Sequence, residues 1–147
     1  MPMLAEAEAA ETRSFLATQP GILAIDRWIE DVASAWDVAE GVLFRARVCV
    51  AEIAANLLEH GSAHPGRDET KLSLQQRGPA IEVEISDTGR GFDPTRPATY
   101  SAAAEAAGGH GLRLVRAYAS RMTYRREGGR NLLLLRVEPA ASSPSTR

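Results

Sequence analysis

Glu52-Ile53-Ala54-Ala55-Asn56-Leu57-Leu58-Glu59-His60-Gly61 is the first of three short segments that decide the fold of this chain. The second is Asp87-Thr88-Gly89-Arg90-Gly91-Phe92-Asp93, and the third is Gly108-Gly109-His110-Gly111-Leu112-Arg113-Leu114-Val115. Acidic, amide and glycine residues in this order suggest a nucleotide pocket. The pocket is neither a P-loop nor a Rossmann site, because the chain contains no G-x-x-x-x-G-K-[ST] run and no G-x-G-x-x-G run.

Length and composition indicate one globular domain. The chain has 147 residues, of which 44% are hydrophobic and 24% charged, and its formal net charge is −2. A charge so close to zero implies no general affinity for nucleic acid or for an anionic membrane. The sequence contains no run of 18 apolar residues, and its start does not resemble a signal peptide, so we expect a cytoplasmic protein without a membrane segment.

The two ends of the chain differ in composition from the part between them. Residues 1–11 are rich in Ala and Glu and are expected to be flexible, and residues 139–147 are expected to be a disordered tail. The folded domain is therefore predicted over residues 12–138. The single cysteine, Cys49, lies in an apolar run and is interpreted as a buried small hydrophobe rather than a reactive thiol.

Hydrophobic periodicity predicts the elements of an α+β domain. A short strand is expected over 14–18, and helices are expected over 20–37, over 40–60 and from Gly109 onward. Strands are predicted over 71–75 and 81–86, where apolar and polar residues alternate, over 122–126, and over the apolar run 131–137. Helices on one side of a mostly antiparallel sheet make a two-layer sandwich.

The first segment carries a polar stripe on its predicted helix. Glu52, Asn56, Glu59 and His60 fall at positions i, i+4, i+7 and i+8, on one face. If this face lines a pocket, Asn56 can offer an amide oxygen to Mg²⁺ and Glu52 can accept a proton from a nucleophile. The alternative is that the stripe is the solvated side of the helix. His60 is interpreted as a structural residue.

The other two segments have a functional and a plain interpretation. Asp87 follows a strand, where its carboxylate can accept a hydrogen bond from the exocyclic amine of adenine while Gly89 lets the base approach the backbone. The same residues are also common in ordinary turns. The glycines before the third helix place backbone amides where a phosphate can bind, although glycine also precedes helices that bind nothing.

The three segments together resemble the motifs of the Bergerat-fold ATPases, the superfamily of gyrase, Hsp90, histidine kinases and MutL. Glu52 and Asn56 match the N box, and the two glycine boxes are matched by Asp87, Gly89 and Gly91, and by Gly109 and Gly111. The compact size, the Gly-His-Gly-Leu-Arg-Leu-Val run and the Gly-Gly-Arg-Asn-Leu-Leu-Leu ending resemble the anti-sigma-factor serine-protein kinases (RsbW-like). The resemblance covers about residues 12–138.

This resemblance implies ATP and Mg²⁺ as cofactors and a role for each matched residue. Glu52 would be the general base, Asn56 would hold Mg²⁺, and residues 93–108 would form a lid over the nucleotide. The remaining cofactor-binding positions would contact adenine or border the phosphates: Asp87, Gly89, Gly91, Gly109, His110, Gly111 and Leu112.

The resemblance also implies a substrate and partners. The chain would phosphorylate a serine of a STAS-type antagonist and sequester a sigma factor, without direct contact with nucleic acid. Arg27 lies near the place where relatives use an arginine to contact partners. The apolar first helix and the early strand could supply a homodimer interface.

One feature departs from the kinases of this family. The stretch Pro97–Gly111 contains no Lys or Arg, although positive groups usually stabilise phosphoryl transfer. Two alternatives therefore stay open beside the kinase. One is a non-catalytic binding module gated by ATP, and the other is a stand-alone histidine-kinase-like ATPase.

Overall fold

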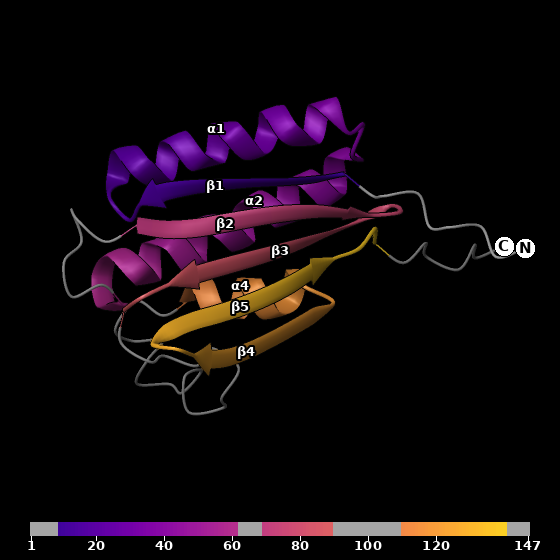
Figure 1. Cartoon of the computed structure of the whole chain (residues 1–147). Helices are drawn as coiled ribbons and strands as arrows, with labels where there is room; N and C mark the ends of the chain where they lie inside the picture. The colour runs from indigo at the N-terminus through magenta and orange to yellow at the C-terminus, as the bar shows by residue number, and fades with distance from the viewer. Residues whose placement is uncertain (1–8, 62–68, 90–109, 141–147) are drawn as a thin grey trace, which may run out of the picture.

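The chain folds into a five-stranded antiparallel sheet that is covered on one face by helices (Figure 1). The computed structural model describes residues 9–61, 69–89 and 110–140. The strand order is β1-β2-β3-β5-β4, and every neighbouring pair is antiparallel. The elements are β1 (Ala10–Leu16), α1 (Gln19–Ala35), α2 (Glu40–Asn56), a π-helical turn η1 (Leu57–Gly61), β2 (Glu69–Arg77), β3 (Ala80–Asp87), α4 (His110–Tyr118), β4 (Arg121–Glu127) and β5 (Arg130–Val137). The predicted α+β two-layer fold is confirmed.

The first strand is longer and begins earlier than the sequence indicated. β1 starts at Ala10, inside the segment that we expected to be flexible, and pairs with β2 from Ala10↔Gln75 to Leu16↔Glu69. Within β1 only Phe15 is buried, because the strand lies at the edge of the sheet. A strand with one buried side chain shows no alternation of apolar and polar residues, so its sequence does not reveal its length.

Helix α1 begins with a side-chain cap. Thr18 precedes the helix, and its hydroxyl oxygen accepts a hydrogen bond of 3.1 Å from the backbone amide of Gly21. Gly21 is required by the close approach of β1, because a Cβ atom at this position would lie 1.9 Å from the carbonyl oxygen of Leu16. The chain therefore reverses tightly from β1 into α1.

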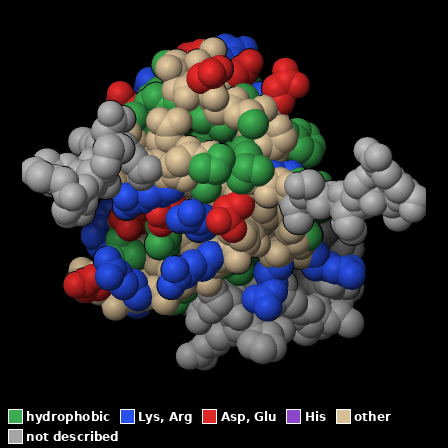
Figure 2. Space-filling view, turned by 90° about the vertical axis from the view of Figure 1, so that its right-hand side faces the viewer, with side chains coloured by type: hydrophobic (Ala, Val, Ile, Leu, Met, Phe, Trp, Pro, Cys, Tyr) green, Lys and Arg blue, Asp and Glu red, His purple; other side chains and the backbone are tan. Residues whose placement is uncertain are grey.

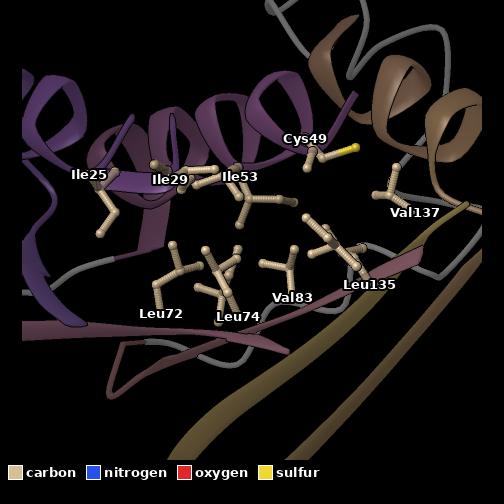
Figure 3. Close-up of a cluster of buried hydrophobic side chains, with 14 of the residues drawn as sticks. Ile25, Ile29, Cys49, Ile53, Leu72, Leu74, Val83, Leu135 and Val137 are labelled. Atoms are coloured by element: carbon tan, nitrogen blue, oxygen red, sulfur yellow. The ribbon is translucent and has the colours of Figure 1, made fainter. Parts of the chain in front are cut away.

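The core lies between the helices and the sheet (Figure 3). Ile25 and Ile29 of α1 and Cys49 and Ile53 of α2 point toward strand residues, and alternate residues of β5 are buried. The labelled strand residues of this cluster are Leu72, Leu74, Val83, Leu135 and Val137. The side chain of Cys49 is fully buried, as predicted, and burial raises the pKa of its thiol to about 12.

Ion pairs and a hydrogen bond connect neighbouring elements at the end of the domain where β5 ends. Figure 2 shows basic and acidic side chains next to one another at this end. Glu82 of β3 accepts from Arg77 at 2.7 Å and lies 3.6 Å from Arg136 of β5. The guanidinium of Arg45 on α2 donates a hydrogen bond of 2.6 Å to the carbonyl oxygen of Glu138, which ties the chain beyond β5 to the helical layer.

Candidate nucleotide site

The described parts of the three sequence segments come together at one end of the fold. Helix α2 ends, strand β3 ends and helix α4 begins at the end of the sheet opposite the β2–β3 turn (Figure 1). Helices α2 and α4 also pack directly against each other. The topology thus brings together groups that are far apart in the sequence. Gly91, Gly109 and the expected lid over 93–108 lie outside the described residues.

Asn56 is the last residue of α2, and Glu52 lies one helical turn before it. Both side chains are half-buried. The amide nitrogen Nδ2 of Asn56 is fully buried, yet it has no hydrogen-bond partner among the described residues. A buried donor without an acceptor costs about 1–3 kcal/mol. An amide in this state is suited to a ligand, because rotation about χ2 presents either its donor or its oxygen.

The predicted continuation of this helix to residue 60 is wrong in one respect. The α-helix ends at Asn56, and Leu57–Gly61 continue as a single π-helical turn, in which hydrogen bonds run from i to i+5. Glu59 lines a cavity of about 960 Å³ between α1 and α2, together with Ala55 and Leu58. Glu52 and Asn56 do not line this cavity, so the predicted polar stripe is divided between two surfaces. Nothing is described for the side chain of His60.

Asp87 and Gly89 form a closed turn at the end of β3. The backbone amide of Gly89 donates a hydrogen bond of 2.8 Å to Oδ1 of Asp87, which is an Asx-type turn. The amide Nδ2 of Asn131 on β5 donates a second bond, of 3.0 Å, to the same oxygen. Oδ2 of Asp87 accepts no hydrogen bond from any residue in the described ranges. The carboxylate therefore has one oxygen held by the protein and one available.

Sequence reasoning missed the residues that hold this turn. Asn131 is 5% exposed, and its Oδ1 accepts hydrogen bonds from the hydroxyl of Tyr124 and, at 2.8 Å, from Nη1 of Arg126. Nη1 of Arg126 also lies 3.0 Å from the carbonyl oxygen of Gly89 and donates to it. The available signal was an asparagine at the start of a run of four leucines, since a buried amide in an apolar strand requires partners.

The N-terminus of α4 supplies the third part of the site. The helix begins at His110, with Gly111 in its first turn. Leu112 was predicted as a cofactor-binding residue, but its side chain is 3% exposed and packs in the core. A contact between Leu112 and a nucleotide would therefore use its backbone. Backbone amides in the first turn of a helix have no partner within the helix, and they favour an anion.

Comparison with known proteins identifies the family of this domain. Residues 16–137 match the histidine kinase-like ATPase domain family. A relative in Bordetella bronchiseptica, the serine/threonine-protein kinase BtrW, is 30% identical over 122 residues, which cover 79% of this chain and 84% of the relative.

Solved structures share the fold at low sequence identity. The structure of the RsbU and RsbW domains of Rv1364c from Mycobacterium tuberculosis superposes with a TM-score of 0.62 and 14% identity, covering 88% of this chain and 32% of that chain. The SiaB–SiaC complex from Pseudomonas aeruginosa gives a TM-score of 0.52 and 12% identity, with 86% and 88% of the two chains covered. At such identity these structures support the fold alone.

The site and the fold define an ATPase domain of the histidine kinase-like class. The chain belongs to the histidine kinase-like ATPase family, and its predicted Bergerat fold is confirmed. Within this family it is similar to a protein named as a serine/threonine kinase, in agreement with the resemblance to RsbW-like kinases. Within the described ranges no helix is long and apolar enough to cross a membrane.

Proposed function

We propose that the chain is a Mg-ATP-dependent serine-protein kinase that phosphorylates a STAS-type antagonist and sequesters a sigma factor. The observation that carries the proposal is the turn at the end of β3, in which Asp87 keeps one carboxylate oxygen available at the end of the fold where α2 finishes and α4 starts. The similarity to a serine/threonine-protein kinase supports the choice of reaction.

Adenine would be recognised by Asp87. Its available oxygen is an acceptor, which matches the exocyclic amine of adenine and not the carbonyl of guanine. The backbone of Gly89 is buried beside it, where the absence of a side chain lets the base approach. Phosphates would bind at the N-terminus of α4, among the backbone amides of the Gly109-His110-Gly111-Leu112 segment.

Asn56 and Glu52 would take part in phosphoryl transfer, Asn56 by binding the metal and Glu52 by accepting a proton. Asn56 would bind Mg²⁺ through Oδ1, because Mg²⁺ prefers oxygen ligands and keeps several waters. Its buried Nδ2, which has no partner among the described residues, is a donor and would not contact the metal. Bound Mg²⁺ neutralises charge on the phosphate oxygens. Glu52 lies one helical turn before Asn56 and would accept the proton of the serine hydroxyl as it attacks.

We propose that the chain binds its protein partners through the outer surface of α1 and α2. Arg27 is exposed on α1, as the resemblance requires for a partner contact. On the same layer, Leu23 and Phe44 are 55% and 59% exposed and border the cavity between α1 and α2. The solved SiaB–SiaC complex shows that a protein of this fold is found with a partner. A homodimer through α1 and the edge strand β1 is part of the same proposal.

A second candidate is a non-catalytic module that binds ATP to shape its partner surface. The stretch Pro97–Gly111 favours it, because this stretch contains no Lys or Arg to stabilise the charge on a transferring phosphoryl group. A stand-alone ATPase that phosphorylates histidine is the third possibility.

An assay of the transfer of labelled phosphate from ATP to a candidate STAS-domain partner distinguishes the three possibilities. We expect an acid-stable phosphoserine from the parent protein, and a loss of about 10²–10⁴-fold in rate in Glu52→Gln, which keeps the size of the side chain and removes the base. Glu59→Gln is the matched control, since Glu59 faces the cavity between α1 and α2. Tight ATP binding without transfer would support the binding module, and an acid-labile product would support histidine phosphorylation.

A further inference from the structure

The β4–β5 hairpin places an arginine against the turn that carries Asp87. Gly128 and Gly129, the two central residues of the hairpin turn, both have positive φ, at 57° and 76°. Glycine adopts these angles without strain, and a two-residue turn of this kind fixes the register of the strands that it joins. Glu127 consequently pairs with Arg130, and the next pair along the hairpin is Arg126 with Asn131. Side chains of directly paired residues share a face of the sheet.

Arg126 fixes the Asn131 amide from its oxygen side, in the same orientation that the acceptors Asp87 and Gly89 select from its nitrogen side. A guanidinium can only donate, so its bond of 2.8 Å identifies the acceptor atom as Oδ1 of Asn131. The donor Nδ2 of the same amide then faces Oδ1 of Asp87 at 3.0 Å and the carbonyl oxygen of Gly89 at 3.3 Å. Tyr124 also bonds to Oδ1 of Asn131, but a hydroxyl can donate or accept and does not by itself select an orientation.

Arg126 also acts on the turn directly. Its Nη1 donates to the carbonyl oxygen of Gly89 at 3.0 Å, so one nitrogen bridges β5 and the turn after β3. Arg126 itself is exposed, whereas both of its acceptors belong to buried residues. A surface ion pair would contribute little, but a donor to buried acceptors has greater effect. Without Arg126 each acceptor would lose one donor, although Oδ1 of Asn131 would keep the bond from Tyr124 and the carbonyl of Gly89 the 3.3 Å contact from Asn131.

We propose that Arg126 is a positioning residue for nucleobase recognition. Together with Asn131 it holds Oδ1 of Asp87 and the carbonyl of Gly89, so that Oδ2 of Asp87 remains available to the 6-amino group of a purine. This inference rests on the proposed ATP site. It adds that selection of the 6-amino group depends on β4, an element that contains none of the three sequence boxes.

The test compares Arg126→Met with Arg125→Met in the full chain. Arg125 is the adjacent residue on β4, it pairs with Leu132 across the hairpin, and its ion pair is a surface contact of 3.5 Å with Glu127. Calorimetry would measure the binding of Mg-ATP and of Mg-purine riboside triphosphate, which lacks the 6-amino group.

We expect the parent to bind ATP more tightly than the analogue. In Arg126→Met, affinity for ATP should fall about tenfold, roughly the effect of one hydrogen bond to a charged group, while affinity for the analogue changes less than about twofold. Arg125→Met should match the parent.

Hydrogen exchange of the Gly89 amide in the absence of nucleotide provides a second readout. Because this amide donates to Asp87, loosening of the turn should accelerate its exchange in Arg126→Met and not in Arg125→Met. The inference is overturned if Arg126→Met keeps the parent's discrimination, or if it loses both nucleotides equally, as a purely structural defect would. A parent protein that binds the two nucleotides equally would instead reject the proposed adenine site, and the inference with it.

Discussion

Asn131 on β5 donates a hydrogen bond of 3.0 Å from its amide to Oδ1 of Asp87 on β3, across 44 residues of sequence. The two residues are directly paired in the sheet, at the end of β3 and near the start of β5. The bond occupies the oxygen that also accepts from Gly89, so the carboxylate is held on one side and available on the other. A carboxylate prepared in this way can accept from a ligand without first being reoriented.

Asp87→Asn is expected to weaken ATP binding by at least about tenfold. The amides of Gly89 and Asn131 both donate toward the inner oxygen, so the new amide must turn its own oxygen to them. Its NH₂ group then faces the amine of adenine, and two donors meet. Titration calorimetry with ATP and GTP measures the effect. Equal affinity of the parent for the two nucleotides would contradict the role of Asp87.

Asn56→Ala is expected to abolish the dependence of nucleotide binding on Mg²⁺ and to remove most of the affinity. In the absence of nucleotide its melting temperature should be no lower than that of the parent, because the replaced amide nitrogen is buried without a partner. Circular dichroism melts with and without Mg-ATP provide the measurement. An unfolded variant would show that Asn56 is structural.

The stability of the domain is expected to fall at alkaline pH through Cys49. Burial raises the pKa of this thiol to about 12, so the folded state keeps its proton at pH values where an unfolded chain has lost it. The stabilising contribution is complete below the unfolded pKa of about 8.5 and is lost progressively as the pH rises toward 12, at up to about 1.4 kcal/mol per pH unit.

Urea unfolding between pH 8 and pH 10.5 would measure this loss, with Cys49→Ala as the comparison. The variant should be less stable at neutral pH, because it leaves a cavity in the core, but its stability should depend less on pH. Parallel pH profiles for the two proteins would contradict the assignment. The native thiol should also resist alkylation at pH 8, since the thiolate is the reactive form.

Arg47→Lys is expected to destabilise the domain by about 1 kcal/mol. Arg47 on α2 donates to both carboxylate oxygens of Asp26 on α1, at 2.9 and 2.7 Å, and lysine cannot reproduce this paired geometry. The hydrogen bond with Asp26 is also the main cause that raises the pKa of Arg47. Arg27→Lys, at an exposed position of α1, is the matched control, and urea denaturation is the measurement. Equal stability of the two variants would show that the pair does not hold α1 to α2.

Local sequence was sufficient for the class of fold and for the order of the three boxes. Helical spacing of apolar residues located α1 and α2, because each buries one face. Alternation located β2 and β3, and an apolar run located β5; in all three strands alternate residues enter the core. The burial of Cys49 followed from its apolar neighbours.

Other features depended on contacts between distant parts of the chain. The length of β1 is set by its pairing with β2, and the π-helical turn after Asn56 is not visible in a pattern of apolar residues. Glu59 lines the cavity between α1 and α2 and Asn56 does not, because the π-helical turn changes the direction of each side chain after Asn56.

The sequence by itself determined that Asp87 stands at the end of a strand with a glycine two residues later, which is enough to suggest a base-binding turn. Only the tertiary structure decided which oxygen of Asp87 is available and which residues hold the other. Those residues, Asn131 and Arg126, reach the turn because β5 pairs with β3 and the Gly128-Gly129 turn sets the register of β4. Strand pairing joins residues without regard to their separation in sequence, so no local pattern contains it.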